Sequence, residues 1–386
     1  MDNQLNRLEK RIIKEIKGAP NERITFYRFM QLALYDAEDG YYTRQRDKIG
    51  KTADFYTSSS VNPVFAKTLL NSFLEMFSQL GYKEQLNFLE IGGGDGKFAK
   101  DLLDELQSAH PTTYKNFRYY LLEASKYHEQ LQNERLTEHQ EQVRLIGSLD
   151  ELPKNFQGII FANELVDAFP VHRVLKRTDE LREVYVTWDE GNSKFVEITG
   201  PLSDIRLVDY FYSFEIELRE GQRAEINLDV IDWLESVAGV LASGYLVLID
   251  YGHLAEVLYD TSRHDGSLMC YYQHQSNDNP YRLVGEQDIT THVNFSAIIN
   301  EAAKLGMEQI YYNFQSNFLM SSGILDFFSE NTGQGNNKSE QEQQLKTNRA
   351  IRQLITPGEM GEVFKVIIFN KGIEKATYKF QKNIWD

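Results

Sequence analysis

Glycines and a carboxylate are concentrated in one short stretch, "FLEIGGGDGKFA", at residues 88–99. Gly92, Gly94 and Gly96 follow Glu90 at every second position, directly after an apolar run. Glycine has no side chain, so such a cluster lets a ligand approach the bare backbone at the end of a strand. The stretch therefore predicts a binding loop for a phosphate, a dinucleotide or a related cofactor.

Two phosphate-binding patterns can be compared with this stretch. A Walker A loop fails, because Phe98 replaces the hydroxyl residue that must follow the lysine. The dinucleotide spacing is matched at residues 94–99, which leaves an oxidoreductase open. The E-x-G-x-G-x-G form resembles class I S-adenosylmethionine-dependent methyltransferases more closely. Glu90 would repel pyrophosphate, whereas it can favour a cofactor with ammonium and sulfonium charges.

Polar residues follow the next two apolar runs as well. Glu123 ends the second run, where its carboxylate can accept hydrogen bonds from two ribose hydroxyls. Ser148 and Leu149 follow the third run, at the turn where methyltransferases hold adenine. Parallel strands end at a common edge, so these residues together predict a nucleoside site.

A further group of polar residues follows the fourth apolar run, in "FANELVDAFPVHRV". Asn163 supplies an amide and is expected to bind the cofactor. Glu164 and Asp167 supply two carboxylates. Two acids beside a methyl donor suit a cationic nitrogen acceptor such as arginine, whose planar donors match carboxylates bidentately. The two acids are expected to position one nitrogen of the acceptor in line with the methyl group and to stabilise the positive charge that remains on the acceptor. Asp167 can equally be a helix cap.

Short apolar runs alternate with helical patterns and would position these residues. The expected strands lie at 86–91, 118–123, 143–147, 158–162 and 244–250, and the expected helices between them at 97–109 and 126–140. This alternation is typical of a parallel sheet covered on both faces. The stretches 307–314 and 361–372 can pair without a crossover, so an antiparallel last strand is expected. The predicted fold is an α/β, Rossmann-like class I methyltransferase sheet, because dinucleotide folds normally continue parallel.

The other segments are expected to add to this sheet. Residues 1–80 carry an amphipathic helix and an aromatic-rich segment, and are predicted to form an N-terminal cap. Residues 81–386 are the predicted methyltransferase domain, with insertions at about 174–226 and 253–287. The first insertion contains an expected hairpin and a strand-like stretch at 209–218. The second is rich in Tyr, His, Asn and Asp, as is typical of a functional lid.

Composition limits the partners and the compartment. The formal net charge of −16 disfavours a nucleic-acid partner and suits small molecules or a cationic group on a protein. A single Cys270 excludes an internal disulfide and suits a reducing compartment. His264 and His274 are too isolated to predict a metal site. No apolar run approaches the roughly 18 residues of a membrane span, so a cytoplasmic protein is expected. Its oligomeric state stays open, a homodimer being one possibility.

Several longer motifs occur in a family-specific order from about residue 24 to 372. They include "DFYTSSSVNP", "LEIGGGDG", "NELVDAFPV", "GEQDITTHVNF" and "PGEMGEVFKVIIFNKG". This order resembles the MidA-like S-adenosylmethionine-dependent methyltransferases, a family that includes the mitochondrial complex I assembly arginine methyltransferase. The chain departs from the family at Ala53 and Ser59, where glycine and proline are common. The resemblance implies S-adenosylmethionine as cofactor and methyl transfer to a protein side chain.

The resemblance also implies roles for residues outside the glycine loop. Four of them would lie over the methionine end of the cofactor: Tyr41, Tyr42, Asp54 and Thr57. Asp288 and His292 would lie on the lid side of the cleft. His292 can serve as a base near neutral pH, or simply be a polar residue at a helix start.

The favoured hypothesis is a methyltransferase that acts on a nitrogen of a protein partner, arginine guanidinium being preferred. Its expected catalytic residues are Glu164, Asp167 and His292. One alternative is an S-adenosylmethionine-binding assembly factor without catalysis, and another is a dinucleotide-dependent oxidoreductase. The glycine motif and Glu123 indicate that the cofactor is bound, which both the methyltransferase and the assembly-factor hypotheses require, so they do not distinguish these two.

Overall fold

The computed structural model describes residues 5–44, 62–81, 85–178, 180–329, 338–358, 360–374 and 377–381. The chain forms two compact units. Unit 1 comprises Met1–Phe55, Val166–Leu234 and Gly252–Glu301, and unit 2 comprises Tyr56–Leu165, Glu235–Tyr251 and Ala302–Asp386. The expected division into a cap of residues 1–80 and a methyltransferase domain stays a prediction.

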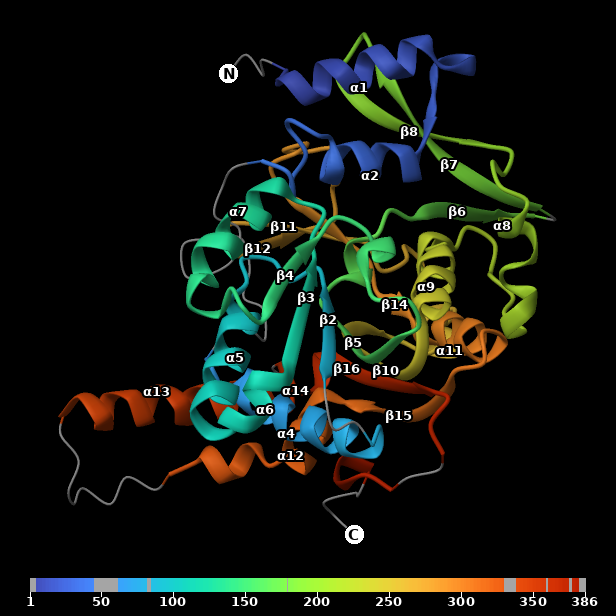
Figure 1. Ribbon diagram of the computed structural model, residues 1–386. Coiled ribbons are helices and arrows are strands. Elements are labelled where there is room, and N and C mark those ends of the chain that lie inside the picture. Colours follow the sequence, from blue (N-terminus) through green and yellow to red (C-terminus); the bar gives the residue numbers. More distant parts are fainter. Residues whose placement is uncertain are drawn as a thin grey trace. The chain divides into compact units, whose positions relative to one another are not determined.

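Unit 2 is built around a mixed sheet with the strand order β15-β16-β10-β5-β2-β3-β4 (Figure 1). The strands are β2 (Leu86–Ile91), β3 (Phe117–Leu122), β4 (Val143–Ile146), β5 (Phe156–Asn163), β10 (Leu241–His253), β15 (Glu308–Phe314) and β16 (Phe364–Lys371). Strands β10, β5, β2, β3 and β4 run parallel, whereas β16 is antiparallel to both of its neighbours. The expected α/β sheet with an antiparallel last strand is confirmed.

The strands of unit 2 are apolar along their length because helices cover the sheet. Phe73 of α4 (Val64–Gln79) packs on Phe88, with ring centroids 5.0 Å apart. Phe98 of α5 (Lys97–Ala109) packs on Phe161 at 4.8 Å. Each such buried ring contributes roughly 1.5–3 kcal/mol. The other helices of unit 2 are α6 (Pro111–Asn116), α7 (Lys126–Arg135), α12 (Gln315–Ser321), α13 (Lys338–Ile355) and α14 (Met360–Val363).

Unit 1 contains two smaller sheets. In the larger one, β1, β7, β6 and β9 are neighbours in that order and β8 pairs with β7; in the smaller one the order is β12-β11-β13. These strands are β1 (Ile24–Thr25), β6 (His172–Arg177), β7 (Glu180–Asp189), β8 (Lys194–Gly200), β9 (Arg223–Ile226), β11 (Met269–Tyr272), β12 (Gln275–Asn277) and β13 (Asp288–Thr290). Helices α1 (Arg7–Gly18) and α2 (Phe26–Tyr35) bury an apolar face against the larger sheet, which confirms the amphipathic first helix.

The strand expected at 209–218 is wrong. This segment contains the end of α8 (Arg206–Asp209) and a 3-10 turn over Tyr212–Phe214. Beyond the turn, Ile216 and Leu218 also pack inward; in the helical part, the residues that do so are Leu207, Tyr210, Phe211 and Phe214. Their spacing is i, i+3, i+4 and i+7, which is the helical period rather than the strand alternation.

The helix after β9 begins after a residue whose side chain caps it. Helix α9 (Asp229–Val240) begins after Asn227, whose Oδ1 accepts a hydrogen bond from the Val230 N–H at 3.0 Å. Helix α11 comprises Phe295–Lys304. Within the described ranges, no helix is both long and apolar enough to cross a bilayer.

Candidate functional site

The glycine loop of unit 2 connects β2 to α5 and uses its glycines for two reasons. Gly92, Gly94 and Gly96 have φ angles of 74°, 54° and 77°, in the left-handed region that favours glycine. Gly93 is instead confined by its neighbours. A Cβ added there would lie 2.6 Å from a Leu121 methyl carbon and 2.9 Å from a carboxylate oxygen of Glu90. The loop therefore excludes side chains at all four positions.

Glu90 lies at the base of this loop and is only 4% exposed. The Tyr119 hydroxyl donates a hydrogen bond to Glu90 Oε2 at 2.7 Å. Burial raises the pKa of Glu90 to about 8; the hydrogen bond from Tyr119 lowers it, while the carboxylates of Glu123 and Asp95 raise it. A cationic ligand would favour the ionised form and lower the pKa again. This environment fits the positive charges of S-adenosylmethionine.

Glu123 follows β3 and is bound to the glycine loop. Its Oε2 accepts a hydrogen bond from the Gly94 N–H at 3.1 Å, and its Oε1 accepts one from the Ser125 N–H at 2.9 Å. An ionised carboxylate offers about four acceptor positions, and these two hydrogen bonds from described residues use two of them. The position of Glu123 is thus compatible with the nucleoside role expected of it.

The strand register brings the ends of β2, β3 and β4 together. Ile91 pairs with Leu122, and Leu122 pairs with Ile146. Ser148, two residues beyond β4, caps a 3-10 turn that includes Leu149, and its N–H donates to Glu151 Oε1 at 3.2 Å. Glu90, the loop, Glu123 and these turn residues therefore share one edge of the sheet.

The end of β5 lies at the same edge, because Ala162 pairs with Ile91. Asn163 Nδ2 donates to Glu164 Oε1 at 3.1 Å, while Asn163 Oδ1 is buried without a hydrogen-bond partner among the described residues. Glu164 has a φ of 53°, which is unfavourable for a residue with a side chain. Such strain is often retained at functional sites, and here it turns the chain directly after the strand.

Unit 1 holds a second group of polar residues, which we call the acid–tyrosine cluster: Asp167, Asp288, Tyr42 and Tyr271. The Tyr42 hydroxyl donates to Asp288 at 2.9 Å from Oδ1 and 3.1 Å from Oδ2. Asp288 pairs with Tyr271 across β13 and β11. Burial raises the pKa of Tyr42 well above its usual value, and the negative charges of Asp288 and Asp167 raise it further. Burial raises the pKa of Tyr271 as well, and the charges of Asp167 and Asp288 raise it further.

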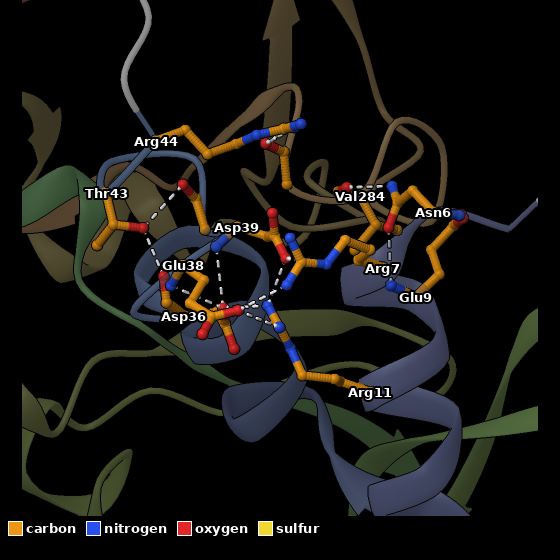
Figure 2. Close-up of polar contacts among 12 residues, drawn as sticks. Asn6, Arg7, Glu9, Arg11, Asp36, Glu38, Asp39, Thr43, Arg44 and Val284 are labelled. Carbon is orange, nitrogen blue, oxygen red and sulfur yellow. Dashed lines mark hydrogen bonds and ion pairs between the residues drawn. The ribbon is translucent and has the colours of Figure 1, made fainter.

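An ionic network holds the turn that carries Tyr42. Figure 2 shows the Arg11 guanidinium of α1 between three carboxylates, 2.5 Å from Asp36, 2.9 Å from Glu38 and 2.7 Å from Asp39. At the end of the turn, Arg44 donates to the Gly285 carbonyl oxygen at 3.1 Å. The turn is therefore bound both to α1 and to the expected lid segment, within unit 1.

His292 follows β13 and has different neighbours from the cluster. Its ring centroid lies 5.3 Å from that of His253, and its backbone N–H donates to Ser267 Oγ at 3.1 Å. A hydrogen bond of 3.2 Å joins His253 Nε2 to Arg263. The backbone of Thr291, the preceding residue, donates to the Asp167 carbonyl oxygen at 3.0 Å. In unit 1, His292 is therefore the residue directly after one whose backbone binds Asp167.

Not every predicted site residue can be placed. Asp54 and Thr57 lie outside the described residues. Glu164 belongs to unit 2, whereas Asp167, His292 and Tyr42 belong to unit 1. No group of three or more metal-ligating side chains occurs among the residues that the structure describes.

Two contacts of the glycine motif were not predicted from the sequence. Tyr119 lies within an apolar run and looks like an ordinary core residue, yet its hydroxyl binds Glu90. Gln132 lies in the polar helix α7, yet it is fully buried and binds the loop. A buried amide in a polar helix has no sequence signal of its own.

Comparison with known proteins identifies the family. A family model described as "Putative S-adenosyl-L-methionine-dependent methyltransferase" matches residues 68–313. The chain belongs to this methyltransferase family. The resemblance to MidA-like methyltransferases is thereby confirmed.

Solved structures and curated relatives agree with this assignment. A Burkholderia thailandensis protein bound to S-adenosyl-homocysteine is 31% identical, with a TM-score of 0.87, and the match covers 97% of this chain and 95% of that chain. Protein arginine methyltransferase NDUFAF7 of Xenopus tropicalis is 26% identical over 325 residues, 77% of this chain and 72% of its own length. Its Homo sapiens counterpart is 25% identical over 387 residues, covering 93% and 83%.

These comparisons settle the cofactor and the class of fold. The fold is that of class I methyltransferases, and the cofactor is S-adenosyl-L-methionine rather than a dinucleotide. The glycine loop, Glu123 and the Asn163 Oδ1 atom, which has no hydrogen-bond partner in the described part of the chain, fit this group. Together they offer close backbone approach and acceptors for its hydroxyl and ammonium donors. The protein is thus an S-adenosyl-L-methionine-dependent methyltransferase.

Proposed function

We propose that this methyltransferase acts on a nitrogen of a protein side chain, and that the preferred acceptor is the guanidinium group of arginine. The acid–tyrosine cluster is the observation that carries the proposal. Asp167 and Asp288 are 6% and 3% exposed, and the negative charges of both raise the pKa values of the two cluster tyrosines. Carboxylates bind guanidinium in bidentate fashion, and tyrosine rings attract cations. The distant relatives named as protein arginine methyltransferases support the same acceptor.

The proposal gives each of these residues a separate role. When bound, the cofactor supplies a methyl group made electrophilic by the sulfonium. In unit 2, Glu90, Glu123 and the glycine loop hold the cofactor, and Asn163 supplies an acceptor. In unit 1, Asp167 and Asp288 fix the acceptor nitrogen and stabilise its positive charge.

A nitrogen acceptor must also lose a proton when its new bond to carbon forms. His292 is the proposed base for this step, since histidine changes its charge near neutral pH. Glu164 keeps its expected role as a carboxylate that orients the acceptor. Tyr42 keeps Asp288 oriented through its hydrogen bond. Much of the rate gain then comes from positioning and electrostatics.

The decisive experiment uses radiolabelled S-adenosyl-L-methionine with a lysate from a strain that lacks this protein. Labelled bands are analysed by mass spectrometry, and methylarginine on a protein is the expected product. Label on lysine, on RNA or on a small molecule would overturn the arginine proposal. Cofactor binding with no labelled product would instead favour a non-catalytic assembly factor.

A further inference from the structure

Gly94, in the middle of the glycine loop, is held through both sides of its backbone. Its N–H donates to Glu123 Oε2 at 3.1 Å, and its carbonyl oxygen accepts from Gln132 Nε2 at 2.7 Å. Glu123 is the residue expected to bind the ribose. The orientation of the Gly94 backbone and the position of a cofactor-binding carboxylate are therefore linked.

Gln132 is placed for this contact by the packing of α7. Its side chain is fully buried, and a Cβ added at Gly96 would lie 3.1 Å from its Cγ. The amide orientation follows from chemistry, because a carbonyl oxygen accepts only from the nitrogen of the amide. Gln132 Oε1 has no hydrogen-bond partner among the described residues, so the bond to Gly94 is the polar contact that the structure gives this side chain.

A second residue of α7 contacts the same loop one turn later. Arg135 Nη1 lies 2.5 Å from Asp95 Oδ2, and Asp95 Oδ1 accepts from the Lys97 N–H at 3.0 Å at the start of α5. Residues three positions apart share one face of a helix. One face of α7 thus contacts two successive residues of the loop, Gly94 and Asp95.

We propose that Gln132 is a positioning residue for S-adenosyl-L-methionine, with Arg135 in a supporting role. Glycine can adopt several backbone conformations, and a loop that must be ordered on binding loses affinity. The Gln132 amide holds Gly94 in its left-handed conformation before the cofactor arrives. The hydrogen bond thereby preorganises the loop and, through Gly94, the carboxylate of Glu123.

The test measures S-adenosyl-homocysteine affinity by calorimetry. Gln132→Met keeps the size of the side chain and removes the donor, and we expect its Kd to rise about tenfold, which corresponds to about 1.4 kcal/mol. Gln130→Met is the matched control, because Gln130 is an exposed glutamine on the same helix. Arg135→Ala is expected to raise Kd by a smaller factor, since its ion pair is partly exposed.

Gln132→Glu separates positioning from packing. Its carboxylic acid can donate to the Gly94 carbonyl when protonated, whereas the carboxylate would repel it. Relative to the unchanged protein at each pH, we expect near-normal Kd at pH about 5.5 and a Kd raised at least tenfold at pH about 8.5. Melting curves without ligand verify that each variant is folded.

Three outcomes would overturn the proposal. The first is a Gln132→Met variant that is folded and binds as tightly as the Gln130→Met control. The second is a Gln132→Glu variant whose relative Kd does not depend on pH. The third is a loss of affinity that appears only together with unfolding in both Gln132 variants, which would assign the residue to core packing alone.

Discussion

The cofactor edge of unit 2 and the acid–tyrosine cluster of unit 1 are built in different ways. At the cofactor edge, the chain itself forms the contact surface, through a left-handed glycine loop and the ends of adjacent parallel strands. In the cluster, side chains from separate segments act together: the Tyr42 hydroxyl binds Asp288, and the charges of Asp167 and Asp288 raise the pKa of both tyrosines. Under the proposed function, acceptor recognition depends on these two carboxylates and two phenols.

This difference has a consequence for how each region can be damaged. A backbone site fails when any side chain enters it, whatever its chemistry, because space and φ are the limiting quantities. A side-chain site keeps its shape when a carboxylate becomes an amide, but it loses charge. Substitutions can therefore separate cofactor binding from acceptor binding.

The largest effect is expected from Gly94→Val. A β-branched residue at a φ of 54° is strained, and its side chain would occupy space where backbone meets cofactor. Calorimetry should show an S-adenosyl-homocysteine Kd raised by ~100-fold or more. Gly81→Val is the control, because Gly81 also has a positive φ, 69°, but an added Cβ meets no atom within 4 Å. Unchanged affinity in Gly94→Val would refute the role of the loop.

The second prediction concerns Asp288→Asn, a substitution within the acid–tyrosine cluster. The amide keeps the size of the side chain but removes the negative charge that would attract a guanidinium. We expect kcat/KM for methyl transfer to protein to fall ~100-fold, with a much smaller loss of S-adenosyl-homocysteine affinity. Asp265→Asn, at an exposed position of the same unit, is the matched control. If both variants retain full transfer, the cluster is not the acceptor site.

The same difference explains what the sequence could predict. The strand at 86–91 and the helix at 97–109 have the expected bounds, because apolar period and glycine positions are local signals. The strand at 209–218 failed, because aromatic residues at helical spacing resembled an alternating pattern in a short window. Local patterns thus predicted the sheet and its glycine loop.

Side-chain partners from distant segments were beyond local patterns. The hydrogen bond of Tyr119 to Glu90 joins two strands, and that of Gln132 to Gly94 joins a helix to a loop. Both depend on which way a side chain turns once the core is packed. The raised pKa of Glu90 is likewise a product of burial, which the sequence position alone does not give.

The third prediction uses that pKa to test charge at the backbone site. Because burial raises the pKa of Glu90 to about 8, its carboxyl group is mostly protonated at pH about 6.5. The pKa of this group in the unfolded chain is near 4.5, so between about pH 4.5 and pH 8 the folded protein disfavours the ionised form. A cationic cofactor favours the ionised form, so binding should release up to one proton. Affinity should therefore increase as pH rises from about 5 to 8.

Calorimetry in buffers of different ionisation enthalpy measures this proton directly. Glu90→Gln should abolish the release, because it cannot ionise. Tyr119→Phe should enlarge the release near pH 8, since the lost hydrogen bond normally lowers the pKa. Proton uptake, or release that persists in Glu90→Gln, would contradict the assignment of Glu90.

The smallest expected difference in free energy concerns Glu164, whose backbone is strained and whose side chain is proposed to act in methyl transfer. At a φ of 53°, glycine avoids the clash that any Cβ causes, so Glu164→Gly should unfold with a free energy about 1 kcal/mol higher than Glu164→Ala. Both variants should bind S-adenosyl-homocysteine and lose methyl transfer. Equal stability of the two would mean that the left-handed turn carries no strain. Full transfer in either would remove the Glu164 carboxylate from the reaction and leave acceptor recognition to the cluster of unit 1.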